Sequence, residues 1–377
     1  MVCRFVFVFA ISTVAISFEA AATAEETQPD GDSKRRATAL LKKLDKDGNG
    51  TFERSENEAL WRRYRKLDAN RDEALTVTEL RRWKPTYLST SGEQKRDLVY
   101  KQTNEGDLLL DLYYPAKEPK QEPDALPLVV YTHGGGWSAG DKHNITRGSF
   151  PPVFTQLLGH GFAVASVSYR LCQQGNEIAM RDCVTDCKDA CRYLALQQDS
   201  LRLDSNRFFV MGDSAGGHIA QMLLLTPDDS FVGDPRLAAA QYRIQAGVSW
   251  YGPCDFENVH LFNHDDREGF RDRFEARIMG SAAGEDAKRT RYHEISPVNY
   301  LSEGSPPLLM LQGDNDTTIP VKHALHMASR ASSIDAPVEI MIIQNAGHNW
   351  RRVNEDIEPS REAIIQRTVQ FLVETLH

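Results

Sequence analysis

Residues 212–217 contain a serine between small residues, an arrangement that exposes a nucleophilic hydroxyl group. The preceding run, 207–211, is typical of a buried strand, and the following run, 218–225, is typical of a helix with an apolar face. A strand, a Gly-x-Ser-x-Gly turn and a helix together form a nucleophile elbow. The pattern therefore predicts Ser214 as the nucleophile of an acyl transfer. The alternative is an ordinary glycine-rich turn.

A second glycine-rich segment, His133-Gly134-Gly135-Gly136-Trp137, directly follows the apolar run 126–132. Consecutive glycines let the backbone approach a substrate and direct N–H groups at a developing oxyanion. We expect these donors to be the N–H groups of Gly135 and Gly136, together with that of Ala215, the residue after the serine.

Two carboxylates follow the apolar run 308–312, in the segment Gly313-Asp314-Asn315-Asp316. The acid that orients a catalytic imidazole is expected after a strand that lies beyond the nucleophile in the chain. Asp314 and Asp316 both meet this condition, so the residue types alone leave the choice open.

The predicted general base is His348, which lies on a small-residue turn after the apolar run 338–343. We expect His323 and His326 to be exposed on a helix, and His133 to be a structural hydrogen-bonding group. The resulting chain order of serine, aspartate and histidine is that of the α/β-hydrolases.

The segment 45–56 matches a different kind of site, the twelve-residue calcium loop of an EF-hand. Gly50, at the sixth position, permits the sharp turn of the loop, and hard Ca²⁺ prefers an oxygen shell of this kind. The expected ligands are Asp45, Asp47, Asn49, the carbonyl group of Thr51, Glu53 and Glu56. The alternative is an acidic turn that matches the pattern by chance.

A second loop begins at Asp68 and matches the calcium pattern less well. Its expected ligands are Asp68, Asn70, Asp72 and Glu79. Glu73 occupies the sixth position, where the pattern requires glycine, so we expect this loop to bind calcium weakly or to stay empty. Phe52 and Leu75 occupy the eighth position of each loop, where short strands of paired EF-hands meet.

Only one helix, expected over 56–66, fits between the two loops. The pair therefore resembles the compact tandem calcium loops of dockerin-like and exported bacterial EF-hand modules. This resemblance implies bound calcium with a buffering or stabilising role, rather than a sensor that opens a groove.

The chain has 377 residues, a net charge of −9 and an isoelectric point near 5.7, which argue against a nucleic-acid-binding protein. Arg4, the apolar run 5–18 and Ala22-Thr23-Ala24 predict a cleavable signal peptide over 1–24. A retained anchor helix is the alternative. We therefore expect a periplasmic or secreted protein without a stable membrane span.

Export permits disulfide bonds. Beyond the predicted signal peptide the cysteines are odd in number, so at least one is unpaired within the chain. Cys183, Cys187 and Cys191 recur at helical spacing, and we expect them to be small buried hydrophobic residues rather than metal ligands. The sequence leaves a Cys172–Cys183 disulfide open.

Strand and helix signals alternate from residue 98 to the end, which predicts an α/β fold with a mostly parallel sheet covered by helices on both faces. A hairpin is expected over 99–114. Further strands are expected at 126–132, 162–169, 207–211, 244–251, 308–312 and 338–343, and helices at 150–160, 177–197, 322–332 and within 357–376. The predicted segments are a flexible leader over 25–36, a small helical EF-hand pair over 37–84, a linker over 85–97, and an α/β-hydrolase domain over 98–377 with a cap or insertion near 254–291.

The second part of the chain resembles α/β-hydrolase esterases of the hormone-sensitive-lipase-like group, and most closely the exported bacterial feruloyl and acetylxylan esterases. The matching segments are 133–137, Tyr169-Arg170-Leu171, 212–217, Ser296-Pro297, 313–320 and Gly347-His348. In that family the aspartate three residues after the glycine of the acid motif belongs to the triad, so the resemblance favours Asp316. The calcium-loop segment lies outside it.

Together these features predict an exported serine carboxylic-ester hydrolase that needs no cofactor for catalysis. The resemblance implies short acyl esters or carbohydrate-linked acetyl and feruloyl esters as substrates. Three alternatives are open: an arylformamidase, a peptidase of the same fold, and a calcium-dependent binding protein on an inactive hydrolase scaffold.

Overall fold

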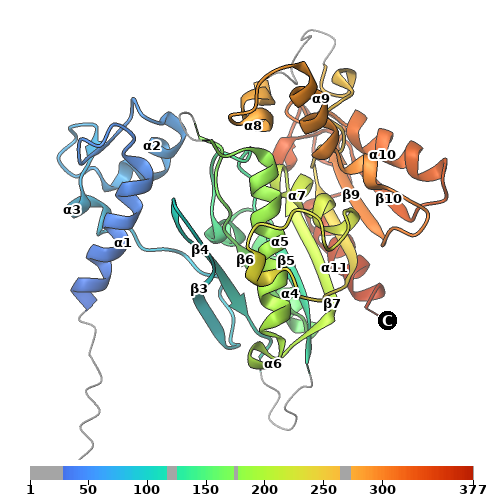
Figure 1. Ribbon diagram of the computed structural model, residues 1–377, viewed down its shortest axis with the longest axis horizontal. Helices are drawn as coiled ribbons and strands as arrows, with labels where there is room; N and C mark the ends of the chain where they lie inside the picture. The colour runs from blue at the N-terminus through green and yellow to red at the C-terminus, as the bar shows by residue number, and fades with distance from the viewer. Residues whose placement is uncertain (1–28, 117–124, 174–176, 264–272, 377) are drawn as a thin grey trace, which may run out of the picture. The chain divides into compact units, whose positions relative to one another are not determined.

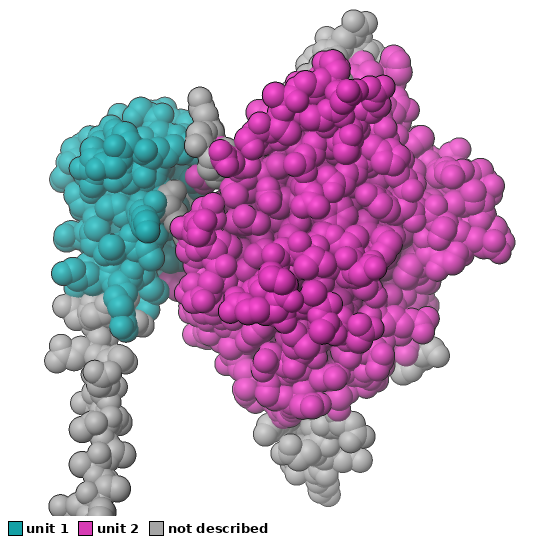
Figure 2. All heavy atoms as spheres, in the orientation of Figure 1, with its two compact units in different colours: residues 1–84 teal, residues 85–377 magenta. Residues whose placement is uncertain are grey.

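The computed structural model describes residues 29–116, 125–173, 177–263 and 273–376. The chain divides into two compact units, residues 1–84 and residues 85–377 (Figure 2). The predicted signal peptide over 1–24 lies outside the described residues. No helix among the described residues is long and apolar enough to cross a membrane.

The first unit is mostly helical. Its elements are α1 (Pro29–Leu44), β1 (Phe52–Glu53), α2 (Glu58–Tyr64), β2 (Ala74–Leu75) and α3 (Val77–Leu80). Phe52 pairs with Leu75 in an antiparallel contact between β1 and β2, as the equivalent loop positions predict. Both side chains are fully buried, in a core that also contains Trp61 and Tyr64. A single short strand pair and one aromatic core therefore join the two loops.

Helix α1 corrects one prediction. It begins at Pro29, so the flexible leader predicted over 25–36 is wrong for residues 29–36. Ala37, Leu41 and Leu44 lie on one helical face and are buried in the core of the first unit. The polar composition of residues 25–36 favoured a flexible segment. The helix packs instead through the apolar face of its later turns.

The second unit is built on an eight-stranded sheet in the order β10-β9-β8-β7-β5-β6-β4-β3 (Figure 1). The strands are β3 (Gln94–Thr103), β4 (Gly106–Tyr113), β5 (Leu126–Thr132), β6 (Ala163–Val167), β7 (Leu203–Asp213), β8 (Ile244–Trp250), β9 (Leu308–Gly313) and β10 (Val338–Ile343). Strands β3 and β4 form the expected hairpin, and β4 also pairs antiparallel with β6. The other neighbours are parallel, so the predicted mostly parallel sheet is confirmed.

Helices cover both faces of this sheet. The α-helices of the described part of this unit are α4 (Phe150–Gly159), α5 (Met180–Leu196), α6 (Gln198–Leu201), α7 (Ala215–Leu225), α8 (Glu275–Met279), α9 (Glu285–Glu294), α10 (Lys322–Ser332) and α11 (Arg361–Glu374). A two-residue strand pair, β11 (Ala346–Gly347) with β12 (Arg351–Arg352), follows the last long strand. Elements α8 and α9 lie in the segment predicted as a cap or insertion.

The alternation of side chains along β5 explains the two layers of helices. Val130 packs in a core with α5, α7 and α10, whereas its neighbour Val129 packs in a second core with α4 and α11. Both residues are fully buried. Because successive side chains of a strand point to opposite faces, a strand that is apolar at every position must be covered on both sides.

The linker predicted over 85–97 is wrong in part. Leu88 is buried in the core of the second unit, and β3 begins at Gln94. The guanidinium group of Arg96 stacks on the ring of Tyr87, 3.8 Å from its centroid. This segment therefore packs as part of the second unit.

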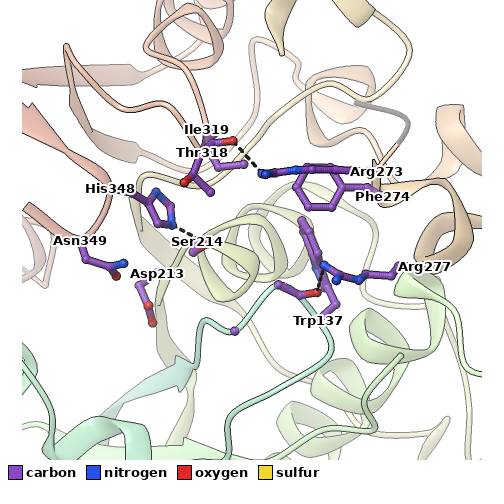
Figure 3. Close-up of a pocket in the computed structure, with 12 residues that line it drawn as sticks. Trp137, Asp213, Ser214, Arg273, Phe274, Arg277, Thr318, Ile319, His348 and Asn349 are labelled. Atoms are coloured by element: carbon purple, nitrogen blue, oxygen red, sulfur yellow. Dashed lines mark hydrogen bonds between the residues drawn. The ribbon is translucent and has the colours of Figure 1, made fainter. Parts of the chain in front are cut away.

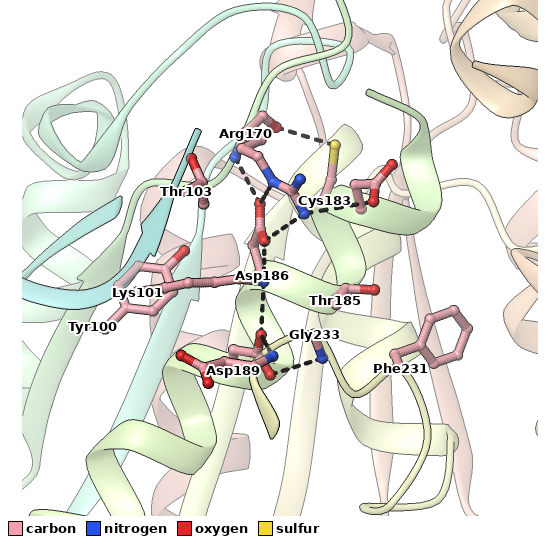
Figure 4. Close-up of polar contacts among 12 residues, drawn as sticks. Tyr100, Lys101, Thr103, Arg170, Cys183, Thr185, Asp186, Asp189, Phe231 and Gly233 are labelled. Atoms are coloured by element: carbon pink, nitrogen blue, oxygen red, sulfur yellow. Dashed lines mark hydrogen bonds and ion pairs between the residues drawn. The ribbon is translucent and has the colours of Figure 1, made fainter. Parts of the chain in front are cut away.

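A buried network of charges ties the antiparallel edge of the sheet to α5 (Figure 4). Lys101 on β3 forms ion pairs of 2.7 Å with both Asp186 and Asp189 on α5. Arg170, which follows β6, also pairs with Asp186, and Arg192 pairs with Asp189. Both carboxylates are fully buried and satisfied by several donors, so the network is fully compensated.

The cysteines of α5 behave as predicted. Cys183, Cys187 and Cys191 are fully buried against the sheet as part of its apolar core. Cys172 and Cys183 are free thiols whose Sγ atoms lie 3.6 Å apart.

Candidate active site

The predicted catalytic residues all follow carboxyl ends of parallel strands. The glycine-rich loop follows β5, Ser214 follows β7, Asp316 follows β9, and His348 follows β10. Parallel strands end at the same edge of a sheet, which is where open α/β sheets bind ligands. The topology therefore gathers residues that are far apart in the chain.

Ser214 lies on the sharp turn between β7 and α7, with backbone angles of φ 52° and ψ −118°. Its N–H group donates to the carbonyl group of Trp250 over 2.8 Å, which holds the turn in place. A side chain on Gly216 would put its Cβ 1.9 Å from the carbonyl oxygen of Thr132, and one on Gly212 would meet Gly216 at 2.1 Å. Only glycine fits at these two positions, as an elbow requires.

The structure brings Ser214, His348 and Asp316 together in one hydrogen-bonded chain. The Nε2 atom of His348 lies 3.0 Å from the Ser214 hydroxyl oxygen, and its Nδ1 atom lies 2.7 Å from Oδ2 of Asp316. These are the distances at which a serine, a general base and its orienting acid operate.

Asp316, rather than Asp314, contacts the imidazole. Asp316 is buried, and its other oxygen accepts the N–H groups of Thr318 and Ile319 at 2.7 and 2.9 Å. Asp314 is exposed and instead accepts the N–H group of Ala346. The two carboxylates therefore have different tasks, and only Asp316 is positioned to orient His348.

Gln312 is a contact that the sequence reasoning missed. This buried residue at the end of β9 donates to Oδ2 of Asp316 over 3.1 Å and to the carbonyl group of Ile319 over 2.7 Å. It therefore holds in place the Asp316 oxygen that contacts His348. A polar side chain inside an otherwise apolar strand was the available signal, because such a group is kept only where it is hydrogen-bonded.

The glycine loop lines the same cavity as the serine. Gly135 has φ 130°, and a Cβ there would lie 2.0 Å from the carbonyl oxygen of Ala139. The hydrogen bonds formed by Gly135 and Gly136 among the described residues use only their carbonyl groups. Ala215 is the first residue of α7, where an N–H group has no partner within the helix. All three predicted donors thus border the site.

Asp213 joins the glycine loop to the elbow. One of its oxygens accepts both the hydroxyl group of Tyr131 and the N–H group of Gly134, each over 2.8 Å. Burial raises the pKa of the Asp213 carboxyl group to about 6, and these two hydrogen bonds oppose the rise. Asp213 therefore holds the glycine loop next to Ser214.

His133 has the structural role that the sequence predicts. Its ring stacks on Tyr169 at 4.2 Å, and Tyr169 donates to the carbonyl group of His133 over 2.6 Å. Trp137, at the other end of the loop, donates from Nε1 to Nδ1 of His218. Both ends of the glycine segment are therefore anchored by buried rings.

An open cavity of about 380 Å³ lies above the serine (Figure 3). Its walls come from the glycine loop, the elbow, the acid and base loops, and the segment near α8. The lining residues are Gly135, Gly136, Trp137, Asp213, Ser214, Arg273, Phe274, Arg277, Thr318, Ile319, His348 and Asn349. The sequence predicted the first two loops and the triad, but not the contribution of 273–277.

The expectation that His323 is exposed is wrong. His323 is fully buried on α10, its ring packs 4.3 Å from that of Phe262, and its Nδ1 atom accepts the N–H group of Cys254. Burial lowers its pKa to about 3. His326 lies on the same helix and is partly exposed, 3.2 Å from Asp255. Helical spacing left open which side of α10 faces the sheet.

The first predicted calcium loop has converging oxygen donors. One carboxylate oxygen from each of Asp45, Asp47 and Glu56 lies within 4.8 Å of the others. Asp45 accepts the N–H groups of Gly48 and Gly50, both of which have positive φ. The other predicted ligands, Asn49, Thr51 and Glu53, are joined by hydrogen bonds within the same loop. An all-oxygen donor set of this kind fits Ca²⁺.

The second loop repeats these contacts with a less suitable sequence. Asp68 accepts the N–H groups of Arg71 and Glu73, as Asp45 does in the first loop. Asn70, Asp72 and Glu79 also form hydrogen bonds inside the loop. Arg71 and Glu73 have φ values of 62° and 61°, a region that favours glycine. The strain predicted at Glu73 is therefore present.

Comparisons with known proteins point to esterases. The model of the BD-FAE family matches residues 110–330. The probable carboxylic ester hydrolase LipM of Mycobacterium tuberculosis is 28% identical over 198 residues, which cover 52% of this chain and 43% of LipM. The chain thus spans less than half the length of that relative.

Two solved structures share the fold. Esterase 2 of Thermogutta terrifontis, phosphonylated by sarin, has a TM-score of 0.61 and 22% identity, and the match covers 78% of this chain and 97% of that one. A truncated carbohydrate esterase from gut microbiota has a TM-score of 0.60 and 18% identity, with 78% and 99% covered.

Proposed function

Because the chain belongs to the BD-FAE family, we propose that it is a serine carboxylic-ester hydrolase that acts through an acyl-enzyme. The observation that carries this proposal is the hydrogen-bonded chain from Ser214 through His348 to Asp316, at the floor of an open cavity. Several esterases among the similar proteins support it.

In the proposed mechanism His348 takes the proton from the Ser214 hydroxyl group as its oxygen attacks the ester carbonyl carbon. Asp316 holds the imidazole in the required tautomer. The N–H groups of Gly135, Gly136 and Ala215 bind the oxyanion, and removing one such donor typically costs about 3–4 kcal/mol of transition-state stabilisation.

Collapse of the tetrahedral intermediate breaks the bond to the leaving alkoxide, which receives its proton from Nε2 of His348. Water then enters, gives a proton to His348 and attacks the acyl-enzyme carbonyl group. The second collapse returns the proton to Ser214 and releases the acid. Every proton passes through one imidazole, which explains why its second nitrogen must be fixed by Asp316.

We extend the proposal to short acyl esters and carbohydrate-linked acetyl or feruloyl esters. The cavity of about 380 Å³ is open to solvent and large enough for such acyl groups. A structural neighbour is described as a carbohydrate esterase, which favours including sugar esters in the substrate panel.

The test is a Ser214→Ala variant assayed on nitrophenyl acetate, acetylated xylan and methyl ferulate. We expect kcat/KM to fall by roughly 10⁴-fold or more, because the nucleophile is lost. A fluorophosphonate probe should label the wild-type protein and not the variant. Substantial ester turnover by the variant, or a wild-type protein that neither labels nor turns over esters, would reject the proposal. Aryl formamides and peptides in the same panel distinguish amide hydrolysis.

Calcium binding by the first unit is a separate part of the proposal. The oxygen donors of Asp45, Asp47 and Glu56 support a Ca²⁺ site in the first loop, and the second loop would bind more weakly. The ion would stabilise the loop and supply no step of ester hydrolysis.

A further inference from the structure

Arg277 lies beside the oxyanion loop and lines the cavity above Ser214. Its Nη1 atom donates to the carbonyl group of Gly136 over 2.9 Å. Within the described residues, Arg277 has no carboxylate partner. Burial lowers the pKa of the guanidinium group, because the charge has lost water without gaining a counter-ion.

Two aromatic side chains and a second cation line the cavity beside Arg277. Phe274 is buried and meets Trp137 edge-on, with ring centroids 5.4 Å apart. The indole N–H of Trp137 is already used by His218, so the indole presents only carbon to the cavity. Arg273, the second cation in the lining, donates to the carbonyl group of Thr318 and stacks on Phe274. This wall therefore combines aromatic surface with positive charge.

The reaction geometry decides which part of an ester faces this wall. The leaving oxygen must lie near Nε2 of His348 to receive its proton, and the carbonyl oxygen must lie near the N–H groups of the glycine loop. Figure 3 shows His348 and Asn349 on one side of Ser214, with Trp137 and Arg277 on the other. The acyl chain is attached to the carbonyl carbon on the side away from the leaving oxygen, so we place it on the side of Ser214 away from His348, where Trp137 and Arg277 line the cavity.

We propose that Arg277 is a specificity-determining residue that binds a carboxylate at the far end of the acyl group, so that the enzyme prefers monoesters of dicarboxylic acids. This inference rests on the proposed ester hydrolysis. Guanidinium groups bind carboxylates through paired, charge-assisted hydrogen bonds, and such bonds are strongest where water is excluded. The aromatic wall accommodates the methylene chain between the two ends.

The experiment compares monophenyl glutarate and monophenyl adipate with phenyl valerate and phenyl hexanoate, which lack the terminal carboxylate. We expect wild-type kcat/KM to be about 10-fold or more higher for the anionic esters. The Arg277→Gln variant should lose this preference, because its kcat/KM should fall at least about 10-fold more on the anionic esters than on the neutral esters. Arg277→Lys should keep part of it, since the charge remains.

Arg289→Gln is the matched control, because it removes the same charge from an exposed position on α9 that does not line the cavity. It should leave the preference unchanged. Equal hydrolysis of both ester types by the wild-type protein would overturn the inference. So would a parallel loss on both types in Arg277→Gln, since that result would mean that Arg277 only supports the loop at Gly136.

Binding to the Ser214→Ala protein separates the inference from the proposed function. Calorimetry should detect adipate binding that weakens with added salt and disappears when Arg277→Gln is combined with Ser214→Ala. Hexanamide, which carries no carboxylate, should bind no more tightly to one protein than to the other. If wild-type protein cleaves no ester, the proposed function fails, and adipate binding still decides the role of Arg277: its absence overturns that role.

Discussion

Ser214 holds a backbone conformation that few residues other than glycine adopt, with φ 52°. Positions of this kind cost about 1–3 kcal/mol and persist only where their surroundings enforce them. Here the enforcing contacts are the bond from its N–H group to Trp250 and the close approach of Gly216 to Thr132. These backbone contacts hold Ser214 at the carboxyl end of β7. A residue larger than glycine at position 216 would prevent them.

Two buried histidines shape the pH dependence of stability. Burial lowers the pKa of His218 to about 4 and that of His323 to about 3. An unfolded histidine has a pKa of about 6.5, so the unfolded chain binds protons first as the pH falls. Both groups therefore make the folded state less stable as the pH drops from about 6.5 towards these values.

We predict that the free energy of unfolding falls less in His323→Leu than in the wild-type protein between pH 7 and pH 4. The difference between the two proteins should grow by up to about 1 kcal/mol per pH unit. The measurement is the free energy of urea unfolding at each pH, and the difference between the two proteins isolates His323 from other titrating groups. His260→Gln, on an exposed position, is the control. Parallel pH profiles for His323→Leu and wild type would contradict the prediction.

At the scale of elements, the charge network in Figure 4 joins the hairpin edge of the sheet to α5. The Asp186 carboxylate is fully buried. It forms ion pairs with Lys101 at 2.7 Å and with Arg170 at 2.8 Å. A buried ion pair adds little stability compared with apolar packing, yet removing one member leaves an uncompensated charge. The network therefore specifies which elements meet.

We predict that Asp186→Asn lowers the free energy of unfolding by about 3–5 kcal/mol, because Lys101 and Arg170 keep their charges inside the protein. Asp286→Asn removes the same charge from an exposed pair with Arg289 and should cost less than about 1 kcal/mol. Chemical denaturation at neutral pH gives both values. Similar small losses for the two variants would show that water reaches the network.

At the scale of the whole molecule, the chain consists of two compact units with separate cores. The proposed ester chemistry uses residues of the second unit only, and the proposed calcium ligands belong to the first. Binding of an ion to the folded form of one unit stabilises that unit by mass action. Calcium should therefore affect stability more than turnover.

We predict that Glu73→Gly strengthens Ca²⁺ binding to the second loop and stabilises the first unit by up to about 1 kcal/mol, because glycine adopts φ near 61° without strain. Calorimetric titration of the full chain should show two sites, with the weaker one tightened in the variant. Asp45→Ala, in the first loop, should instead remove the stronger site. A Glu73→Gly protein that binds Ca²⁺ less tightly than wild type would refute this account.

Local sequence was enough to propose the nucleophile, the oxyanion loop and the base, because each is a short segment at the end of one strand. Ser214 needs its flanking glycines, and His348 needs the small-residue turn at Gly347. The same holds for the strands, since a run such as 126–132 is apolar at nearly every position and must be covered on both faces.

Only the tertiary structure decided contacts between distant segments. It places Asp316 rather than Asp314 against His348, buries His323, and pairs Lys101 with Asp186. It also brings Arg277 to Gly136. Such pairs depend on the order in which strands assemble, and a single sequence carries no local signal for them. The proposed nucleophile could thus be found from its own six residues, whereas the residue proposed to select its acyl group lies on a helix outside every motif.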